Sequence, residues 1–229
     1  MATTIDTVLE DARVLNGVAR KHSGKLVDVG VTEDELTGLE TLINEAGEKD
    51  TEQKQAQNDV RAKTQGQNDA MARSSACIRK VQTAAKAVFL KDKGTLKEFH
   101  VGGKPPATVK AMSTELAYMK EIAGKYKSQL ATRGIKDADI TSFDTCASDL
   151  TTANVEQENA RRLQVAATSA RDKAIENLKD AMYRLRKSAE IQFVDDESVL
   201  NEFKTIVVRR SARKANGQPQ PAAPVEAPK

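Results

Sequence analysis

The chain of 229 residues carries 36 basic and 33 acidic side chains, and only 3% of its residues are aromatic. Its net charge of +3 gives no global field that would attract nucleic acid or a membrane. So little bulky apolar material cannot fill a thick core, but it can fill the thin seams between charged helices.

The ends and the cysteines narrow the class of protein further. No apolar run approaches the roughly 18 residues that a membrane helix needs, and residues 1–6 lack the basic start and apolar run of a signal peptide. The two cysteines, Cys77 and Cys146, imply no disulfide framework. We therefore expect a cytoplasmic protein in which both thiols are small apolar seam residues rather than reactive groups.

The sequence repeats itself with an offset of 104 residues and without a gap. Matching positions include Gly30 with Gly134, Thr41 with Thr145, Ala70 with Ala174, Phe89 with Phe193, and Phe99 with Phe203. An ungapped match over that distance indicates tandem duplication. We divide the chain into a first helical repeat, 1–104, a second helical repeat, 105–210, and a tail, 211–229. The tail is rich in proline and alanine and is expected to be disordered.

Each repeat begins with an amphipathic helix. Apolar residues three and four positions apart predict helices over about 4–28 and 108–132. Gly30 and Gly134 follow, at positions where a left-handed residue commonly ends a helix.

A much longer helix is expected next, over about 32–92 in the first repeat and 137–194 in the second. With no internal proline it could extend roughly 90 Å. Thr32 and Glu35 form a capping box at the first start. At the second start Lys136 replaces the threonine, so Asp137 is expected to take the cap.

Small residues recur along the long helices at every seventh position. They are Ala56 and Ala70 in the first repeat, and Ala153, Ala160, Ala167, Ala174 and Ala181 in the second. Small side chains at one heptad position allow two helices to approach closely. Gly47 and Gly66 weaken the first long helix, so its middle is expected to be the softest helical part. The sequence leaves open whether the helix breaks at these glycines.

A shorter unit follows each long helix: a helical turn and connector at about 94–107, and a segment at about 197–208. Phe99 and Phe203 are expected to anchor these units. The predicted fold is all-α: an elongated antiparallel helical bundle or coiled coil with pseudo-twofold symmetry. Each short helix would then pack on one half of the long pair. A compact four-helix bundle with broken long helices is the alternative.

Candidates for chemistry each have a simpler structural explanation. His22 falls on the seam position that Tyr126 fills in the second repeat. His100 lies in the connector, without a Cys, His or acidic partner at ligand spacing, and no Glu-x-x-His motif supports a diiron site. Gly102-Gly103-Lys104 lacks the strand and the Ser/Thr of a phosphate-binding loop. We predict no catalytic residue, metal, cofactor or small-molecule substrate.

The segment from Lys204 to Lys214 differs from the rest of the chain, because it is basic and contains no acidic residue. It carries Lys204, Arg209, Arg210, Arg213 and Lys214. These side chains could contact phosphates, an anionic membrane or an acidic protein. A solvated basic end to the fold is the simpler interpretation.

The tandem arrangement resembles that of bacterial helical proteins, a resemblance that implies no activity. The sequence favours a non-enzymatic structural or protein-interaction protein, such as a rod, spacer or assembling scaffold subunit. Its partner is then a protein, either a second copy or another chain. The alternative is a binding module whose basic segment engages nucleic acid or a membrane surface. An enzyme is the third possibility, and it is disfavoured because no pair of reactive groups converges.

Overall fold

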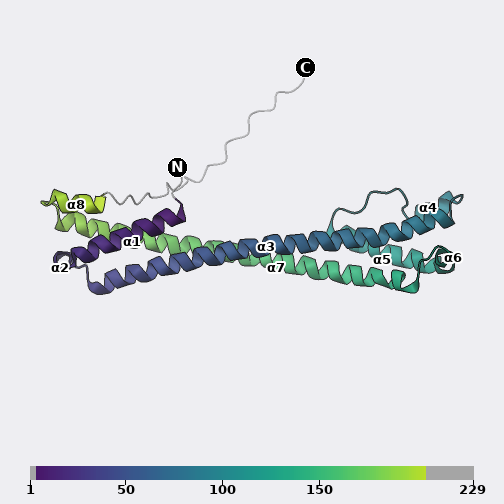
Figure 1. Ribbon diagram of the computed structural model, residues 1–229, viewed down its shortest axis with the longest axis horizontal. Helices are drawn as coiled ribbons and strands as arrows, with labels where there is room; N and C mark the ends of the chain where they lie inside the picture. Colours follow the sequence, from purple (N-terminus) through teal and green to yellow (C-terminus); the bar gives the residue numbers. More distant parts are fainter. Residues whose placement is uncertain (1–3, 205–229) are drawn as a thin grey trace, which may run out of the picture. The chain divides into compact units, whose positions relative to one another are not determined.

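The computed structural model describes residues 4–204, and every regular element in that range is helical. The predicted all-α fold is therefore confirmed. In chain order the elements are α1 (Ile5–Lys21), α2 (Ser23–Leu26), the 3₁₀ helix η1 (Val27–Val29), α3 (Glu33–Val88), α4 (Lys93–Glu98), α5 (Val109–Lys125), α6 (Lys127–Ala131), α7 (Asp137–Gln192) and α8 (Glu197–Lys204) (Figure 1).

The two repeats begin and end their helices with the same local devices. Thr4 and Thr108 each accept a hydrogen bond from the backbone N–H three residues later, at the starts of α1 and α5. Gly30 and Gly134 adopt left-handed φ values of 84° and 82°, which glycine reaches without the steric cost of a Cβ. The two repeats therefore share local backbone conformations as well as a hydrophobic pattern.

The first helix of each repeat is shorter than expected, because it breaks at the same seam position. α1 ends at Lys21 and α5 at Lys125, and the next residues, His22 and Tyr126, leave the helical region at φ −110° and −106°. The break lays the His22 ring 5.5 Å from that of Phe193, and the Tyr126 ring 5.2 Å from that of Phe89. A heptad pattern reports which face is buried, not whether the backbone hydrogen bonds continue, so it could not show this break.

The start of α7 corrects a second expectation. Asp137 is the first helical residue rather than the cap, and the Asp139 carboxylate accepts the backbone N–H of Lys136 at 2.9 Å. This is the N3 half of a capping box, made without a capping hydroxyl. The Lys80 ammonium, followed by the Lys136 N–H, lowers the pKa of Asp139. In α3 the Thr32 hydroxyl accepts from the Glu35 N–H at 3.3 Å, as predicted.

Both long helices are continuous, so the alternative of a compact bundle with broken long helices is wrong. α3 continues through Gly47 and Gly66 to Val88. A Cβ at Gly66 would meet nothing within 4 Å, and one at Gly47 would meet only Leu9 Cδ1 at 3.9 Å. The glycines are thus not required by packing. Their cost to the helix is conformational entropy, which a well-paired helix tolerates.

The described chain divides into two compact units, each built from both repeats. Unit 1 comprises residues 1–50 and 170–229, and unit 2 comprises residues 51–169. In its described part unit 1 contains α1, α2, η1, α8 and one section of each long helix. Unit 2 contains α4, α5, α6 and the remaining sections. The sequence repeat and the compact unit are therefore different divisions of the chain.

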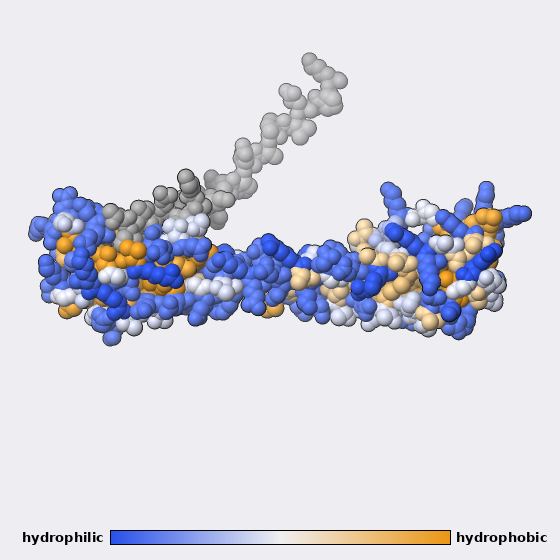
Figure 2. Space-filling model, in the orientation of Figure 1, coloured by the Kyte–Doolittle hydropathy of each residue, from blue (hydrophilic) through white to orange (hydrophobic). Residues whose placement is uncertain are grey.

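Within each unit a short helix covers a pair of antiparallel helix sections. In unit 1, Leu15 of α1 is buried with Leu36 of α3 and Leu178 of α7. In unit 2, Leu116 of α5 is buried with Val81 of α3 and Phe143 of α7. Ion pairs in unit 2 show the antiparallel course, because α3 numbers fall from Lys80 to Lys63 while their α7 partners rise from Asp139 to Glu156. The visible face of each unit is largely hydrophilic, with separate apolar patches (Figure 2).

Candidate functional site

Among residues 4–204, one part of unit 2 consists of two helices without a third. Its apolar core begins at Ala70 on α3 and ends at Leu150 on α7, with Ala153 packed at its edge. Residues 51–69 of α3 and 154–169 of α7 lie outside that core, and we call them the two-helix section. Figure 1 shows the covering helix α5 beside other parts of α3 and α7 in this unit.

The seam of the two-helix section is polar and narrow. Gln157 and Ala160 are its buried residues, at 1% and 7% exposure. Gln157 lies 3.4 Å from the Thr64 hydroxyl, the Gln67 amide donates to Asn154 at 2.9 Å, and Lys63 pairs with Glu156 at 3.0 Å. Hydrogen bonds of this kind align two helices but add little net free energy of folding, because both partners bond water when unfolded.

The outside of the same section is unexpectedly apolar. Val155, Leu163 and Val165 of α7 are 52%, 67% and 71% exposed. Leu163 and Val165 are two residues apart, which places them about 200° apart around the helix and so on both flanks of the seam. A single exposed leucine needs no explanation. None of the described short helices covers this section, so its three large apolar side chains form apolar flanks that further helices could cover.

The structure places the predicted seam alanines at two levels of burial, and none of them is exposed. Ala70, Ala160 and Ala174 are buried, whereas Ala56, Ala153, Ala167 and Ala181 are half-buried. Ala174 and Ala181 belong to unit 1 and the others to unit 2. Whether close packing at these positions is energetically important stays a prediction, which substitution can test.

An aromatic cluster anchors the short helix α4 in unit 2. The Phe99 ring stacks 6.0 Å from Phe89 and lies 5.6 Å from Tyr126. The Glu98 carboxylate accepts from Lys125 at 2.9 Å and from the Tyr126 hydroxyl at 3.1 Å. The Lys125 hydrogen bond lowers the pKa of Glu98, and the Glu98 carboxylate raises the pKa of Lys125 to about 12.

Unit 1 contains the corresponding cluster with one exchange. The Phe203 ring of α8 stacks 5.9 Å from Phe193, and His22 replaces the tyrosine. Glu202 accepts from Lys21 at 3.0 Å and lies 3.3 Å from His22 Nε2, and these contacts lower its pKa, with Lys21 contributing most. Both phenylalanines predicted as anchors, Phe99 and Phe203, are thus buried in aromatic clusters.

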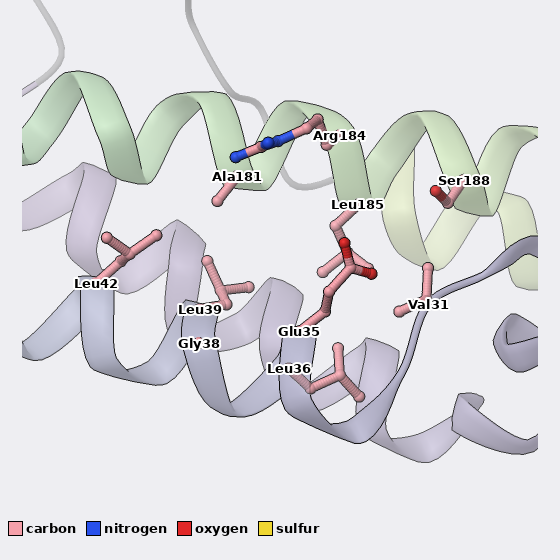
Figure 3. A pocket seen from close by; sticks show the side chains of 10 residues that line it. All are labelled: Val31, Glu35, Leu36, Gly38, Leu39, Leu42, Ala181, Arg184, Leu185 and Ser188. Carbon is pink, nitrogen blue, oxygen red and sulfur yellow. The ribbon is translucent and has the colours of Figure 1, made fainter.

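A pocket of about 380 Å³ lies in unit 1 between α3 and α7 (Figure 3). Leu39 and Leu42 reach toward α7, where Ala181 supplies only a methyl group, while Glu35 and Arg184 stand at the mouth. The space arises from small residues, since the positions of unit 2 that correspond to Gly38 and Ala181 carry the larger Ser142 and Cys77. No pair of polar groups converges inside it.

A second pocket, of about 420 Å³, lies in unit 2 beside the connector after α4. His100 adopts a left-handed φ of 50°, stacks on Tyr118 at 4.6 Å, and its Nδ1 lies 2.9 Å from the Glu115 carboxylate. Sequence spacing assigned His100 no acidic partner. It missed Glu115, fifteen positions later in α5, because the irregular connector between α4 and α5 brings the two side chains together.

The two thiols, expected to be independent seam residues, face each other in unit 2. Cys77 Sγ of α3 lies 3.0 Å from Cys146 Sγ of α7, and both residues are half-buried. A signal for this pairing was present in the sequence. Cys77 corresponds to Ala181 and Cys146 to Leu42, and in an antiparallel pair these positions fall opposite each other.

Of the basic segment, the structure describes only its first residue. Lys204 is exposed at the last position of α8. Arg209, Arg210, Arg213 and Lys214 lie outside the described residues, as do the end of the predicted 197–208 segment and the tail 211–229. Whether these five basic side chains lie together therefore stays a prediction.

Within residues 4–204 no group of three or more His, Cys, Asp or Glu side chains could hold a metal ion. No helix in this range is both long enough and apolar enough to cross a membrane. No protein family matches the chain, and neither curated proteins nor solved structures show a significant match to it.

Proposed function

We propose that this protein is a non-enzymatic, self-assembling helical scaffold, and that two copies associate through the two-helix section of unit 2. The observation that carries the proposal is the combination of a polar seam inside that section with Val155, Leu163 and Val165 outside it. Apolar side chains at these exposures are stabilised by removal from water, at about 25 cal/mol per Å² buried.

A second copy is the partner that fits this surface most simply. It presents the same two-helix section, so two sections packed side by side would make four helices and would remove one apolar flank of each copy from water. An interface of this kind is isologous, the commonest symmetry among soluble oligomers. No observation on the described residues favours nucleic acid or a membrane surface, which stay outcomes of the test.

The cytoplasm is the proposed compartment, because two cysteines in 229 residues provide no disulfide framework. A scaffold needs no reactive centre. The polar groups that do meet in the structure, such as Lys125 with Glu98 and Lys63 with Glu156, join one helix to another.

Sedimentation velocity and light scattering over a concentration series test the proposal. The monomer mass is 24.9 kDa, and we expect the weight-average mass to rise towards twice that value. The double substitution Leu163→Glu, Val165→Glu should weaken the dissociation constant at least about 10-fold, which corresponds to about 1.4 kcal/mol.

Ile191→Glu is the matched control, because Ile191 also lies on α7 and is 68% exposed, but belongs to unit 1. It should leave the mass distribution unchanged. A monomer at every concentration, or equal weakening by the control, would contradict assembly through the two-helix section. In that case low-salt binding to nucleic acid and anionic vesicles would test the basic segment, with loss of binding on salt addition as its signature.

A further inference from the structure

Two sulfur atoms from different helices lie almost at bonding distance in unit 2. Cys77 Sγ and Cys146 Sγ are 3.0 Å apart, and a disulfide bond requires about 2.05 Å. Cysteine side chains are short and unbranched, so small rotations about χ1 can close the remaining distance of about 1 Å. Both residues are half-buried rather than sealed in the core, so a small reagent can reach the pair.

Packing alone does not require sulfur at either position. The corresponding positions in unit 1 carry Ala181 and Leu42, and they line a groove between the same two helices. Alanine and leucine therefore satisfy this part of the fold. The pair of thiols adds a chemical capacity that these positions of unit 1 do not have.

The surroundings of the pair shift the pKa of Cys146. Burial, followed by the neighbouring Cys77, raises the pKa of the Cys146 thiol to about 12, so Cys146 keeps its proton at neutral pH. Arg73 and Asp149 form an ion pair at 3.8 Å, and both act on Cys146, the carboxylate raising and the guanidinium lowering its pKa. The first nucleophilic step is open to either thiol.

We propose that Cys77 and Cys146 are a redox modification site, at which exchange with a low-molecular-weight disulfide such as oxidised glutathione forms a reversible cross-link between α3 and α7 within unit 2. The inference is independent of self-assembly. Disulfides in a reducing compartment are usually transient and redox-sensing, and this pair is placed for that use.

When Cys77 attacks first, the exchange balances in two steps. The Cys77 thiolate attacks one sulfur of the glutathione disulfide, which forms a mixed disulfide at Cys77 and releases one glutathione thiolate. Cys146 then gives its proton to solvent, its sulfur attacks Cys77 Sγ, and the second glutathione thiolate leaves. Both protein thiols are oxidised, the glutathione disulfide is reduced, and two molecules of glutathione thiol result.

The cross-link should stabilise unit 2 because it closes a loop between residues 69 positions apart. Such a closure lowers the conformational entropy of the unfolded chain. We expect the oxidised protein to melt roughly 10 °C above the reduced protein.

The test begins with the full chain in native buffer, equilibrated with oxidised and reduced glutathione at several ratios. We expect both thiols to disappear together as the ratio becomes oxidising, with the protein remaining a single chain on non-reducing electrophoresis. Peptide mapping should then find a disulfide between the segments that contain Cys77 and Cys146, and added reductant should restore both thiols.

The corresponding positions of unit 1 supply the matched variants, Cys77→Ala and Cys146→Leu. Each removes one thiol and inserts the residue that the corresponding position already accommodates, so each should fold. Neither variant should gain melting temperature on oxidation, and Cys146→Leu should stop at the mixed disulfide. The proposal is overturned if the thiols of the wild-type chain stay free at oxidising ratios, or if they react only as separate glutathione adducts or as links between chains.

Discussion

Units 1 and 2 pack the same arrangement of helices with different side chains. Each covers a pair of antiparallel helix sections with one short helix and seals one end with two stacked phenylalanines, Phe193 with Phe203 and Phe89 with Phe99. The third ring of the seal is His22 in unit 1 and Tyr126 in unit 2. Both rings lie within hydrogen-bond distance of the carboxylate that precedes the anchoring phenylalanine, Glu202 or Glu98. The exchange of ring is tolerated because this polar contact is kept.

The interiors differ more than the ends do. At one level Leu39 and Gly38 of unit 1 leave a pocket, whereas the corresponding residues of unit 2 are Phe143, which is fully buried, and Ser142. At the same level Cys77 and Cys146 face each other in unit 2. The comparison shows that backbone and end anchors define this fold, while the volume between the long helices can vary.

The largest expected loss of stability tests whether the two anchoring phenylalanines, Phe99 and Phe203, are equivalent. Phe99→Ala and Phe203→Ala should each cost about 3–5 kcal/mol of unfolding free energy, because each removes a fully buried ring. Hydrogen exchange should show the loss in unit 2 for Phe99→Ala and in unit 1 for Phe203→Ala. If the unfolding free energy of either variant lies within about 1 kcal/mol of that of the parent, the phenylalanine does not stabilise its aromatic cluster as proposed.

A smaller loss of unfolding free energy is expected for substitutions inside the two-helix section of unit 2. Ala160→Leu should destabilise the protein by roughly 1–3 kcal/mol, because Ala160 is buried in a narrow seam. Ala167→Leu should cost less, since Ala167 is half-buried. Ala166→Leu, one residue away and exposed, is the control and should stay within about 0.5 kcal/mol of the parent. Urea unfolding measures all three, and equal costs would mean that the alanine recurrence does not mark a close contact.

Much of this architecture could be predicted, because duplication supplied two independent records of one pattern. The long helices were placed to within four residues of their ends, and the anchoring roles of Phe99 and Phe203 followed from their matched positions. The breaks at His22 and Tyr126 could not be predicted, since the seam pattern continues unchanged through them. Similarly, the cap of α7 depends on which carboxylate reaches the Lys136 N–H, a choice that composition does not decide.

The candidate sites were less accessible to sequence reasoning for a different physical reason. Exposed apolar residues such as Leu163 carry a signal only once it is known that none of the described short helices covers them. The Cys77–Cys146 contact required the register of two antiparallel helices, to which both repeats contribute. The contact between His100 and Glu115 depends on a left-handed residue in an irregular connector.

The pocket allows one residue of unit 1 to be exchanged for the residue at the corresponding position of unit 2. Leu39→Phe places in unit 1 the side chain that unit 2 carries at Phe143, and filling the pocket should raise the unfolding free energy by about 0.5–2 kcal/mol. The reverse change, Phe143→Leu, should lower it by a similar amount, because Phe143 is fully buried. Thermal unfolding of both variants and of the double variant measures the exchange. Destabilisation by Leu39→Phe would show that the walls of the unit 1 pocket cannot adjust to a ring.

The smallest expected effect is a pH dependence that the two end clusters share. The folded-state pKa of Glu98 and of Glu202 is lowered, chiefly by hydrogen bonds from Lys125 and Lys21. A carboxylate with a lowered pKa stabilises the fold above its unfolded pKa of about 4.3, and this contribution disappears as the pH falls through the folded value. Glu98→Gln and Glu202→Gln should therefore each reduce the stability lost between about pH 5 and pH 3, read as the shift in urea midpoint. Glu176→Gln, at an exposed site on α7, is the control. A lysine in each unit adds an alkaline counterpart, because hydrogen bonds to Glu98 and Glu190 raise the pKa of Lys125, to about 12, and of Lys187. Each contribution is complete below the unfolded pKa of about 10.4 and is lost as the pH rises through the folded value. Equal acid sensitivity in parent and Gln variants would show that solvent screens these surface carboxylates completely.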